Sequence, residues 1–468
     1  MSSSSVHLKD CQAWRDCGLS LTTASNDAAK LFDDVITQYI TWTESPDGME
    51  NTVVKLLEAD SSFMMGQALS IGLDLMGTGR PVHLDKEFSN QIDQFEQDFA
   101  KASITPREKS HCQSILYFSQ GEYTKACETW ERILTDYPKD SLAIKFAHDG
   151  YFYLGNSMMI RDSVARVLPH WKNTDPLYGY LKGMLAFGLE EMNQYTEAEK
   201  SCDEALALNP TDCWATHAKA HCMEMTGRYD QGIEFMNRTE NDWSKGRMLA
   251  CHNYWHWALY YIERGDFESA LDIYDQQVIE RSVSSGAMLD MVDASSLLKR
   301  FEMQGVDVGS KRWETVFDLS SSHMNDHLTV FNDFHMMMAY IACKESKEDI
   351  VDKYMSSLTE YCSKNSSFSR DLFELLCFEL CNGLVAFSED RFDDAAQCWY
   401  PIKNDVIKMG GSHAQRDVFD QLLINTCIDS SKKENRILAQ ELLTKRKEKK
   451  QNSPLTDRLM QKLLSKHE

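Results

Sequence analysis

Apolar and small residues recur at helical spacing in two segments of the chain, and each segment ends at a proline. Residues 121–126 read Gly-Glu-Tyr-Thr-Lys-Ala and precede Pro138, whereas residues 193–198 read Asn-Gln-Tyr-Thr-Glu-Ala and precede Pro210. A small residue lets two helices approach closely, and proline cannot continue a helix. The shared spacing predicts two helical hairpins of the same kind.

A small residue in the second helix of each hairpin sets the period of the pattern. It falls at Ala126, Ile160, Ala198, Gly232 and Ala270, and the differences between these numbers are 34, 38, 34 and 38. A 34-residue helical hairpin is the unit of the tetratricopeptide repeat, which stacks into a solenoid. The unit with Ile160 is degenerate, because isoleucine replaces the preferred alanine.

The rest of the chain keeps the helical period with weaker repeat signatures, and no segment shows a β-strand pattern. Residues 63–76 are a predicted helix capped by Asp60-Ser61, and Gly383 with Trp399 restores the repeat spacing late in the chain. We predict an all-α fold, an α-solenoid of tetratricopeptide-like helical hairpins. Its expected parts are an N-terminal helical region (1–105), the clearest tetratricopeptide repeats (106–280), degenerate helical repeats (281–450) and a C-terminal capping helix (451–468).

Composition agrees with a folded protein inside the cell. The chain has 468 residues, of which 43% are hydrophobic and 26% charged. It begins without the basic and apolar stretches of a secretory signal, and no apolar run approaches the roughly 20 residues of a membrane helix. We predict a cytoplasmic protein with no membrane segment. The 14 cysteines form no metal-binding pairs, and five are predicted to be buried thiols: Cys202, Cys222, Cys251, Cys343 and Cys398.

Charge argues against nucleic acid as a partner. The net charge is −23, from 49 basic and 72 acidic residues, so most of the surface would repel a phosphate backbone. The exception is a basic segment at 432–450. We interpret it as a solvated helix face followed by a lysine-rich linker, in preference to a binding patch.

The repeat register assigns side chains to the concave side of the solenoid, where such repeats bind ligands. Those positions hold seven aromatic residues: Phe118, Phe152, Tyr153, Tyr180, Phe187, Trp214 and Trp255. They also hold five acids: Asp149, Glu190, Glu191, Glu224 and Glu263. Such a surface suits a protein or peptide partner or a small cationic ligand. Alternatively, many of the aromatic residues belong to the core.

One familiar partner class is disfavoured. Repeat domains that hold the C-terminal carboxylate of heat-shock chaperones share a lysine followed four residues later by asparagine. Here Lys145 is followed by Asp149, and the later positions that would be basic hold Trp214 and Ala218. The chain is therefore not predicted to be a chaperone-tail carboxylate clamp.

Histidines give the chain its most unusual pattern. His217, His221 and Glu224 share one helix face, and the next repeat adds His252 and His256 at the same spacing. Imidazoles four residues apart on a helix can chelate a metal or handle protons. They can equally form a polar seam between helices. All three interpretations remain open, and His335 and residues 410–417 join the region only if the solenoid curls back on itself.

These positions define the hypothesised binding residues. They are His217, His221, Glu224, His252, His256, Trp214, Trp255 and Glu190. No residue is assigned as catalytic or as a metal ligand, and no cofactor is predicted. The chain lacks the GxSxG, HExxH and Walker motifs, which favours a non-enzymatic protein.

Several segments resemble one family of repeat proteins. They read RDSVAR at 161–166, ACHNYWHWALY at 250–260, GGS at 410–412 and AQRDVF at 414–419. These segments are similar to the tetratricopeptide repeat protein 38 family, and the resemblance extends from DCQAW at 10–14 to NSPLT at 452–456. It implies an intracellular, all-helical repeat protein and assigns no activity.

Two functional hypotheses follow from the sequence. The first is an intracellular repeat protein that binds a peptide or a small cationic ligand on its concave face. The alternative is a metal-dependent or acid–base enzyme that uses the cluster of histidines and glutamates.

Overall fold

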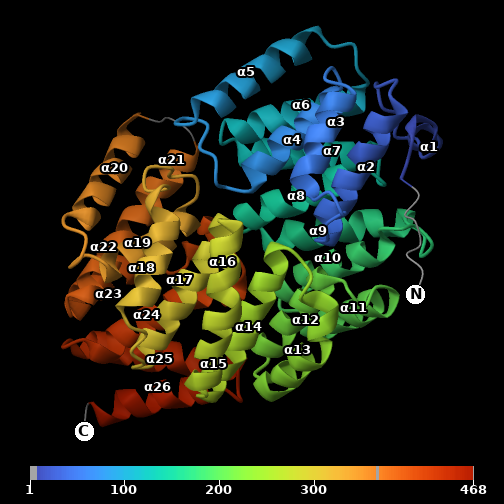
Figure 1. Ribbon diagram of the computed structural model, residues 1–468. Coiled ribbons are helices and arrows are strands. Elements are labelled where there is room, and N and C mark those ends of the chain that lie inside the picture. The colour runs from blue at the N-terminus through green and yellow to red at the C-terminus, as the bar shows by residue number, and fades with distance from the viewer. Residues whose placement is uncertain (1–7, 365–367, 467–468) are drawn as a thin grey trace.

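The computed structural model describes residues 8–364 and 368–466, and within them helices are the only regular secondary structure. The helices follow one another as antiparallel pairs along the chain (Figure 1). This confirms the predicted all-α fold built of stacked helical hairpins.

The N-terminal region precedes the repeats. Its helices are α1 (Cys11–Asp16), α2 (Asn26–Thr41), α3 (Met49–Ala59), α4 (Met64–Met76) and α5 (Lys86–Lys101). The predicted cap of the helix at 63–76 is wrong. Asp60 accepts a hydrogen bond from the Ser62 amide and closes a turn, so Phe63 is the N-cap and makes no side-chain cap bond.

The repeat hairpins come next. They comprise α6 (Pro106–Ser119), α7 (Tyr123–Asp136), α8 (Ser141–Tyr153), α9 (Ser157–Val167), η1 (Leu168–His170), α10 (Tyr178–Glu191), α11 (Tyr195–Leu208), α12 (Cys213–Met225), α13 (Tyr229–Trp243), α14 (Met248–Arg264) and α15 (Phe267–Ile273). The period-setting residues of the sequence pattern lie buried on the second helix of each hairpin. At Gly232, an added Cβ would lie 2.3 Å from the Tyr260 ring, so only glycine fits there.

The second half continues as helices. They are η2 (Tyr274–Val278), α16 (Ile279–Ser285), α17 (Met288–Met303), α18 (Ser310–Ser321), α19 (Val330–Ala342), α20 (Ile350–Lys364), α21 (Phe368–Leu372), η3 (Phe373–Cys377), α22 (Phe378–Ser388), α23 (Phe392–Ile402), η4 (Val406–Met409), α24 (His413–Asp429), α25 (Lys433–Lys449) and α26 (Pro454–Ser465). Four of the five cysteines predicted to be buried are buried. Cys398 of α23 is half-buried.

The C-terminal helices return to the repeats and close the solenoid. Helix α24 packs against α17 and touches α12, and α26 lies beside α14 (Figure 1). At the start of α24, Arg416 Nη2 lies 3.2 Å from Glu191 Oε2 of α10, and the side chains of both are almost fully buried. This ion pair joins residues that are 225 positions apart in the sequence.

The basic segment at 432–450 contributes to this closure, so its interpretation as a purely solvated face and linker is wrong. Arg446 forms an ion pair with Asp417 of α24. Lys450 Nζ lies 3.2 Å from Glu263 Oε2 of α14, and Ser453 donates a hydrogen bond of 2.7 Å to the same carboxylate. These cations are held by the chain's own acids.

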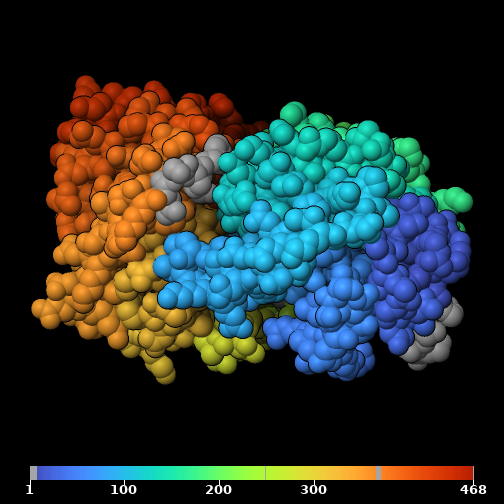
Figure 2. All heavy atoms as spheres, turned by 90° about the horizontal axis from the view of Figure 1, so that it is seen from above, coloured from blue at the N-terminus to red at the C-terminus, as the bar shows by residue number. Residues whose placement is uncertain are grey.

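A second contact links the N-terminal region to the C-terminal half. The Asn332 amide of α19 donates a hydrogen bond to Thr78, and the His83 ring lies 5.4 Å from the Tyr361 ring of α20. In Figure 2, the light-blue residues of α5 extend from the darker blue N-terminal helices toward the orange half. Within the described residues, no helix is both long and apolar enough to cross a bilayer.

Replacing Arg416 with glutamine tests how strongly the closure stabilises the fold. Glu191 would keep its buried carboxylate and lose its cation, and breaking a buried pair in this way costs about 3–5 kcal/mol. We expect Arg416→Gln to lower the free energy of urea unfolding by that amount. The control is Arg391→Gln, because Arg391 pairs with Asp394 on the surface and should matter little. Equal effects of the two variants would contradict a role for closure.

The pH dependence of stability should report the buried His335 side chain. Its Nδ1 donates a hydrogen bond of 2.7 Å to the Phe331 carbonyl, and burial lowers the pKa of His335 to about 3. The unfolded chain takes up this proton near pH 6.5, so stability falls as the pH drops from 6.5 toward 3, by about 1.4 kcal/mol per pH unit. Other buried histidines, such as His148, contribute a slope of the same sign, so we expect the pH dependence of the unfolding free energy to be shallower for His335→Gln than for the parent by this contribution. Parallel pH profiles would show that His335 is not held neutral.

Candidate functional site

The first helices of two consecutive hairpins, α12 and α14, bring four histidines together. Spacing of four residues places His217 and His221 on one face of α12, and the same spacing places His252 and His256 on α14. The two helices pack side by side, so the two faces meet. One ring nitrogen from each histidine lies within 4.8 Å of those of the other three.

Within the cluster, the imidazoles are in direct contact. Nε2 of His217 and Nε2 of His221 are 2.8 Å apart. The ring centroids of His221 and His256 are 4.3 Å apart, and those of His217 and His252 are 4.8 Å apart. Without a cation, one nitrogen of the 2.8 Å pair must donate a hydrogen to the other.

Carboxylates stand behind three of the four rings. Nδ1 of His256 lies 2.9 Å from Glu224, and Nδ1 of His252 lies 2.6 Å from Asp293 of α17. Nδ1 of His221 lies 3.5 Å from Glu190 of α10. A carboxylate on Nδ1 fixes the tautomer and leaves Nε2 as the free donor atom, an arrangement found around metal-bound histidines.

Burial keeps three histidines of the cluster neutral. Desolvation, followed by the neighbouring imidazoles, lowers the pKa values of His217 and His221 well below the ordinary value. The pKa of His256 is lowered for the same reasons. Burial raises the pKa of Glu224 to about 7. Three of the histidines are therefore unprotonated near neutral pH, which is the form that binds a metal.

A second group of acids adjoins the cluster. Glu190, Glu191 and His221 also offer ligand atoms within 4.8 Å of one another. Burial and the charge of Glu191 raise the pKa of Glu190 well above its ordinary value. Glu191 instead pairs with Arg416 and accepts a hydrogen bond of 2.7 Å from the His413 amide.

The histidine cluster forms part of the wall of a partly open cavity of about 260 Å³. His217 and His252 face this cavity, and the His252 side chain keeps 13% exposure. The cavity walls come from α2, α3, α4, α8, α12, α14, α17 and the start of α24. The other lining residues are Gln38, Tyr39, Trp42, Met49, Leu73, Met76, Gly77, His148, Asp149, Phe152, Tyr153, Trp214, Arg247, Leu249, Leu289, Asp290, Asp293, Ser412 and Gln415.

The aromatic residues beside this cavity already hold a cation from the chain itself. The Lys145 ammonium lies 4.6 Å from the Trp42 ring centroid and 5.5 Å from that of Trp214. It also forms an ion pair of 2.7 Å with Asp149. The aromatic and acidic character predicted for the concave side is therefore partly satisfied within the molecule.

The structure brings together all eight hypothesised binding residues. The four histidines form the centre, and Glu224 and Glu190 lie behind two of them. Trp255 stacks on His252 with ring centroids 5.0 Å apart, and Trp214 lies 4.9 Å from His217. Of the eight residues, only Trp214, His217 and His252 line the cavity.

Other residues predicted to line the concave side lie in the core or contact other segments. Phe118 and Phe187 are core residues, and Glu263 binds the C-terminal segment. Residues 410–417 do join the region, because Gln415 approaches Asp293 and Arg416 pairs with Glu191. His335 instead bonds within its own helix.

Sequence reasoning missed Asp293, Trp42 and His148 as parts of this site. Asp293 belongs to the degenerate region and Trp42 to the N-terminal region, so neither could be placed by the repeat register. His148 lies on α8, one residue before the predicted Asp149. The repeat register placed Asp149 on the concave side, and this gave a weak indication that the adjacent His148 lies close to the site.

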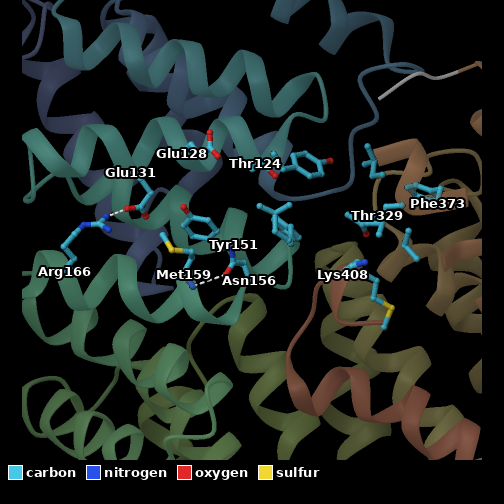
Figure 3. A pocket seen from close by; sticks show the side chains of 17 residues that line it. Thr124, Glu128, Glu131, Tyr151, Asn156, Met159, Arg166, Thr329, Phe373 and Lys408 are labelled. Carbon is cyan, nitrogen blue, oxygen red and sulfur yellow. Dashed lines mark hydrogen bonds and ion pairs between the residues drawn. The ribbon is translucent and has the colours of Figure 1, made fainter. Parts of the chain in front are cut away.

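A larger cavity of about 610 Å³ lies elsewhere, between the first repeats and the C-terminal half. Figure 3 shows Tyr151, Asn156 and Met159 on one side and Thr329 and Phe373 on the other. Its charged residues Glu131 and Arg166 pair with each other. No cluster of metal-ligating groups among the described residues borders it.

Comparison with known proteins finds the same repeat. A sequence profile of the tetratricopeptide repeat matches residues 113–140, which fall within α6, α7 and their connections. The chain therefore contains a tetratricopeptide repeat, as its spacing predicted.

Solved structures with related helical arrangements are distant. A Rap protein complexed with competence and sporulation factor has a TM-score of 0.43 at 12% identity, over 73% of this chain and 100% of its own. A human IFIT1 dimer with m7Gppp-AAAA has a TM-score of 0.39 at 11% identity, over 97% and 96%. A tetratricopeptide repeat protein from Parabacteroides merdae has 0.31 at 13%, over 68% and 98%. Similarity this weak says nothing about what this chain binds.

Proposed function

We propose that this repeat protein binds one divalent transition-metal ion through His217, His221, His252 and His256. The observation that carries the proposal is the convergence of four ring nitrogens within 4.8 Å. Buried imidazoles with no cation between them gain little from such crowding, whereas a metal ion gives all four lone pairs a common partner.

The distances between the ring nitrogens of the four histidines support this assignment. Four nitrogens that bind zinc at about 2.0–2.1 Å in a tetrahedron lie about 3.4 Å apart. Ligand atoms within 4.8 Å of one another reach that spacing with side-chain movements of about an ångström. An all-nitrogen ligand set suits zinc, copper, nickel or cobalt, and does not suit calcium or magnesium, which prefer oxygen.

The carboxylates behind the rings also support a metal. Glu224 and Asp293 each hold an Nδ1, which orients Nε2 of His256 and His252 toward the centre. Their negative charge would offset part of the charge of a divalent ion in a buried site. A polar seam needs no such arrangement, because each imidazole could bond a backbone carbonyl, as His335 does.

The sequence predicted a small cationic ligand of unspecified chemistry, and a metal ion is one such cation. Several acids expected on the concave side are partnered by the chain itself, Glu191 by Arg416 and Glu263 by Lys450. A metal ion is the cation for which the remaining groups are arranged. Binding of a protein or peptide, a cytoplasmic location and membership of the tetratricopeptide repeat protein 38 family stay predictions.

Metal analysis tests the proposal directly. Protein purified without an affinity tag, stripped with a chelator and reloaded with Zn²⁺ should retain about one ion per chain by elemental analysis. His217→Gln combined with His221→Gln should lower the affinity by at least about 100-fold in competition with a chromophoric chelator, because two of four ligands are lost. Retention of no stoichiometric metal by the parent would refute the proposal.

A matched control separates ligation from a general histidine effect. His170 is exposed at the end of η1, outside the cluster. His170→Gln should leave the stoichiometry and the affinity unchanged. Circular dichroism of both variants would confirm that they remain folded.

The carboxylate behind His256 should tune the affinity without being a ligand. Glu224→Gln keeps the size of the side chain and removes its charge. We expect the Zn²⁺ affinity to fall by about 10- to 100-fold, with the stoichiometry still near one, because carboxylates that hydrogen-bond metal-binding histidines typically contribute that much. Competition titrations at pH 8, above the raised pKa of Glu224, give the clearest comparison. An unchanged affinity would show that Glu224 does not support the site.

A further inference from the structure

The cavity and the histidine cluster share a wall. His217 and His252 belong to the cluster and also line the cavity. A metal ion held by the four histidines would therefore lie beside the cavity, within reach of a molecule bound there. A ligand from the cavity would be a fifth ligand of this ion, the coordination number to which catalytic zinc sites expand.

One side of the cavity is a continuous aromatic surface. The rings of Trp42 and Trp214 are stacked with their centroids 5.7 Å apart and their planes 9° from parallel. Phe152 extends the apolar lining, as do the side chains of Leu73, Met76, Leu249 and Leu289. Walls of this composition bind the flat face of an aromatic ring.

Several charged side chains around the cavity are paired within the chain, whereas Asp290 of the wall accepts a hydrogen bond from Ser285 and Asp293 lies beside His252. Lys145 pairs with Asp149 at 2.7 Å, and Arg247 pairs with Glu44 at 2.7 Å. The tryptophan faces that could hold an ammonium are occupied by Lys145. A cationic group of a ligand therefore finds no free tryptophan face here, and the charge of the ligand is placed where it meets the metal.

His148 gives the cavity an unused polar group. Its side chain is buried at 1% exposure, it lines the cavity, and neither of its ring nitrogens makes a well-aligned hydrogen bond, the Ile160 backbone being a weak partner. Burial lowers its pKa to about 3, so the neutral ring offers one donor and one acceptor. A buried imidazole without a well-aligned hydrogen bond is costly unless a ligand satisfies it.

We infer that the cavity binds a small aromatic molecule whose anionic head group coordinates the metal ion held by the four histidines. The aromatic ring lies among the apolar side chains of Phe152, Leu73 and Leu249, and His148 bonds a polar atom of the ligand. This inference rests on the proposed metal site. The volume of about 260 Å³ is below that of pockets for drug-sized ligands, about 300–1,000 Å³, so the ligand is a molecule of one or two rings.

The experiment compares two probes that carry the same metal-binding group. Benzohydroxamic acid has a phenyl ring, and acetohydroxamic acid has a methyl group in its place. The full-length protein is loaded with Co²⁺, whose visible absorption reports coordination. We expect both probes to change the spectrum, with benzohydroxamate binding about 10- to 100-fold more tightly because its ring is buried.

Two variants locate the effect in the cavity. Leu73→Trp places an indole among the lining residues, and it should abolish the preference for benzohydroxamate. Leu208→Trp is the matched control, because Leu208 is exposed on α11 and should leave the preference unchanged. Elemental analysis of each variant checks that Co²⁺ is retained.

The outcomes distinguish the two proposals. Failure of the parent to retain Co²⁺ would overturn the metal site and this inference together. Retained Co²⁺ with equal affinities for the two probes, or with no spectral change, would overturn this inference alone. A preference that survives Leu73→Trp would do the same, because the ring would then bind outside the cavity.

Discussion

The buried ion pair between Arg416 and Glu191 is the constraint on which the arrangement of this molecule depends. Neither charge is stable inside a protein without the other. Glu191 ends a helix of the regular repeats, and Arg416 lies in the first turn of α24. Their pairing therefore requires the chain to turn back after many hairpins and to place α24 against the repeats.

This return changes what the repeats present to their surroundings. A tetratricopeptide array ordinarily offers its inner side to a partner. Here the C-terminal segment supplies partners for acids of the repeats. Lys450 forms an ion pair with Glu263, and Ser453 donates a hydrogen bond to the same carboxylate. The basic segment at 432–450 therefore contacts the repeats through the ion pair of Lys450 with Glu263. What remains accessible is a cavity bordered by the N-terminal helices, the repeats and α24.

The histidine cluster gains its character from the same burial. On an exposed helix face, imidazoles four residues apart would titrate near neutrality and repel each other when charged. Inside the closed molecule, desolvation keeps His217, His221 and His256 neutral, and Glu224 and Asp293 fix two of the rings. Neutral, oriented and close histidines are what the proposed metal site requires, so that proposed binding depends on the same closure of the fold.

The sequence by itself determined the local structure and one half of the site. Helical period and small residues such as Ala126 and Gly232 identified the hairpins, because these signals act between residues that are near in sequence or in adjacent repeats. The same register placed the two histidine pairs on neighbouring helices. Only the tertiary structure decided that Arg416, Asp293 and Trp42 come to this place, and that Arg446 and Lys450 are held rather than solvated. Those contacts join residues far apart along the chain, and a local pattern carries no information on which distant charges or rings will meet.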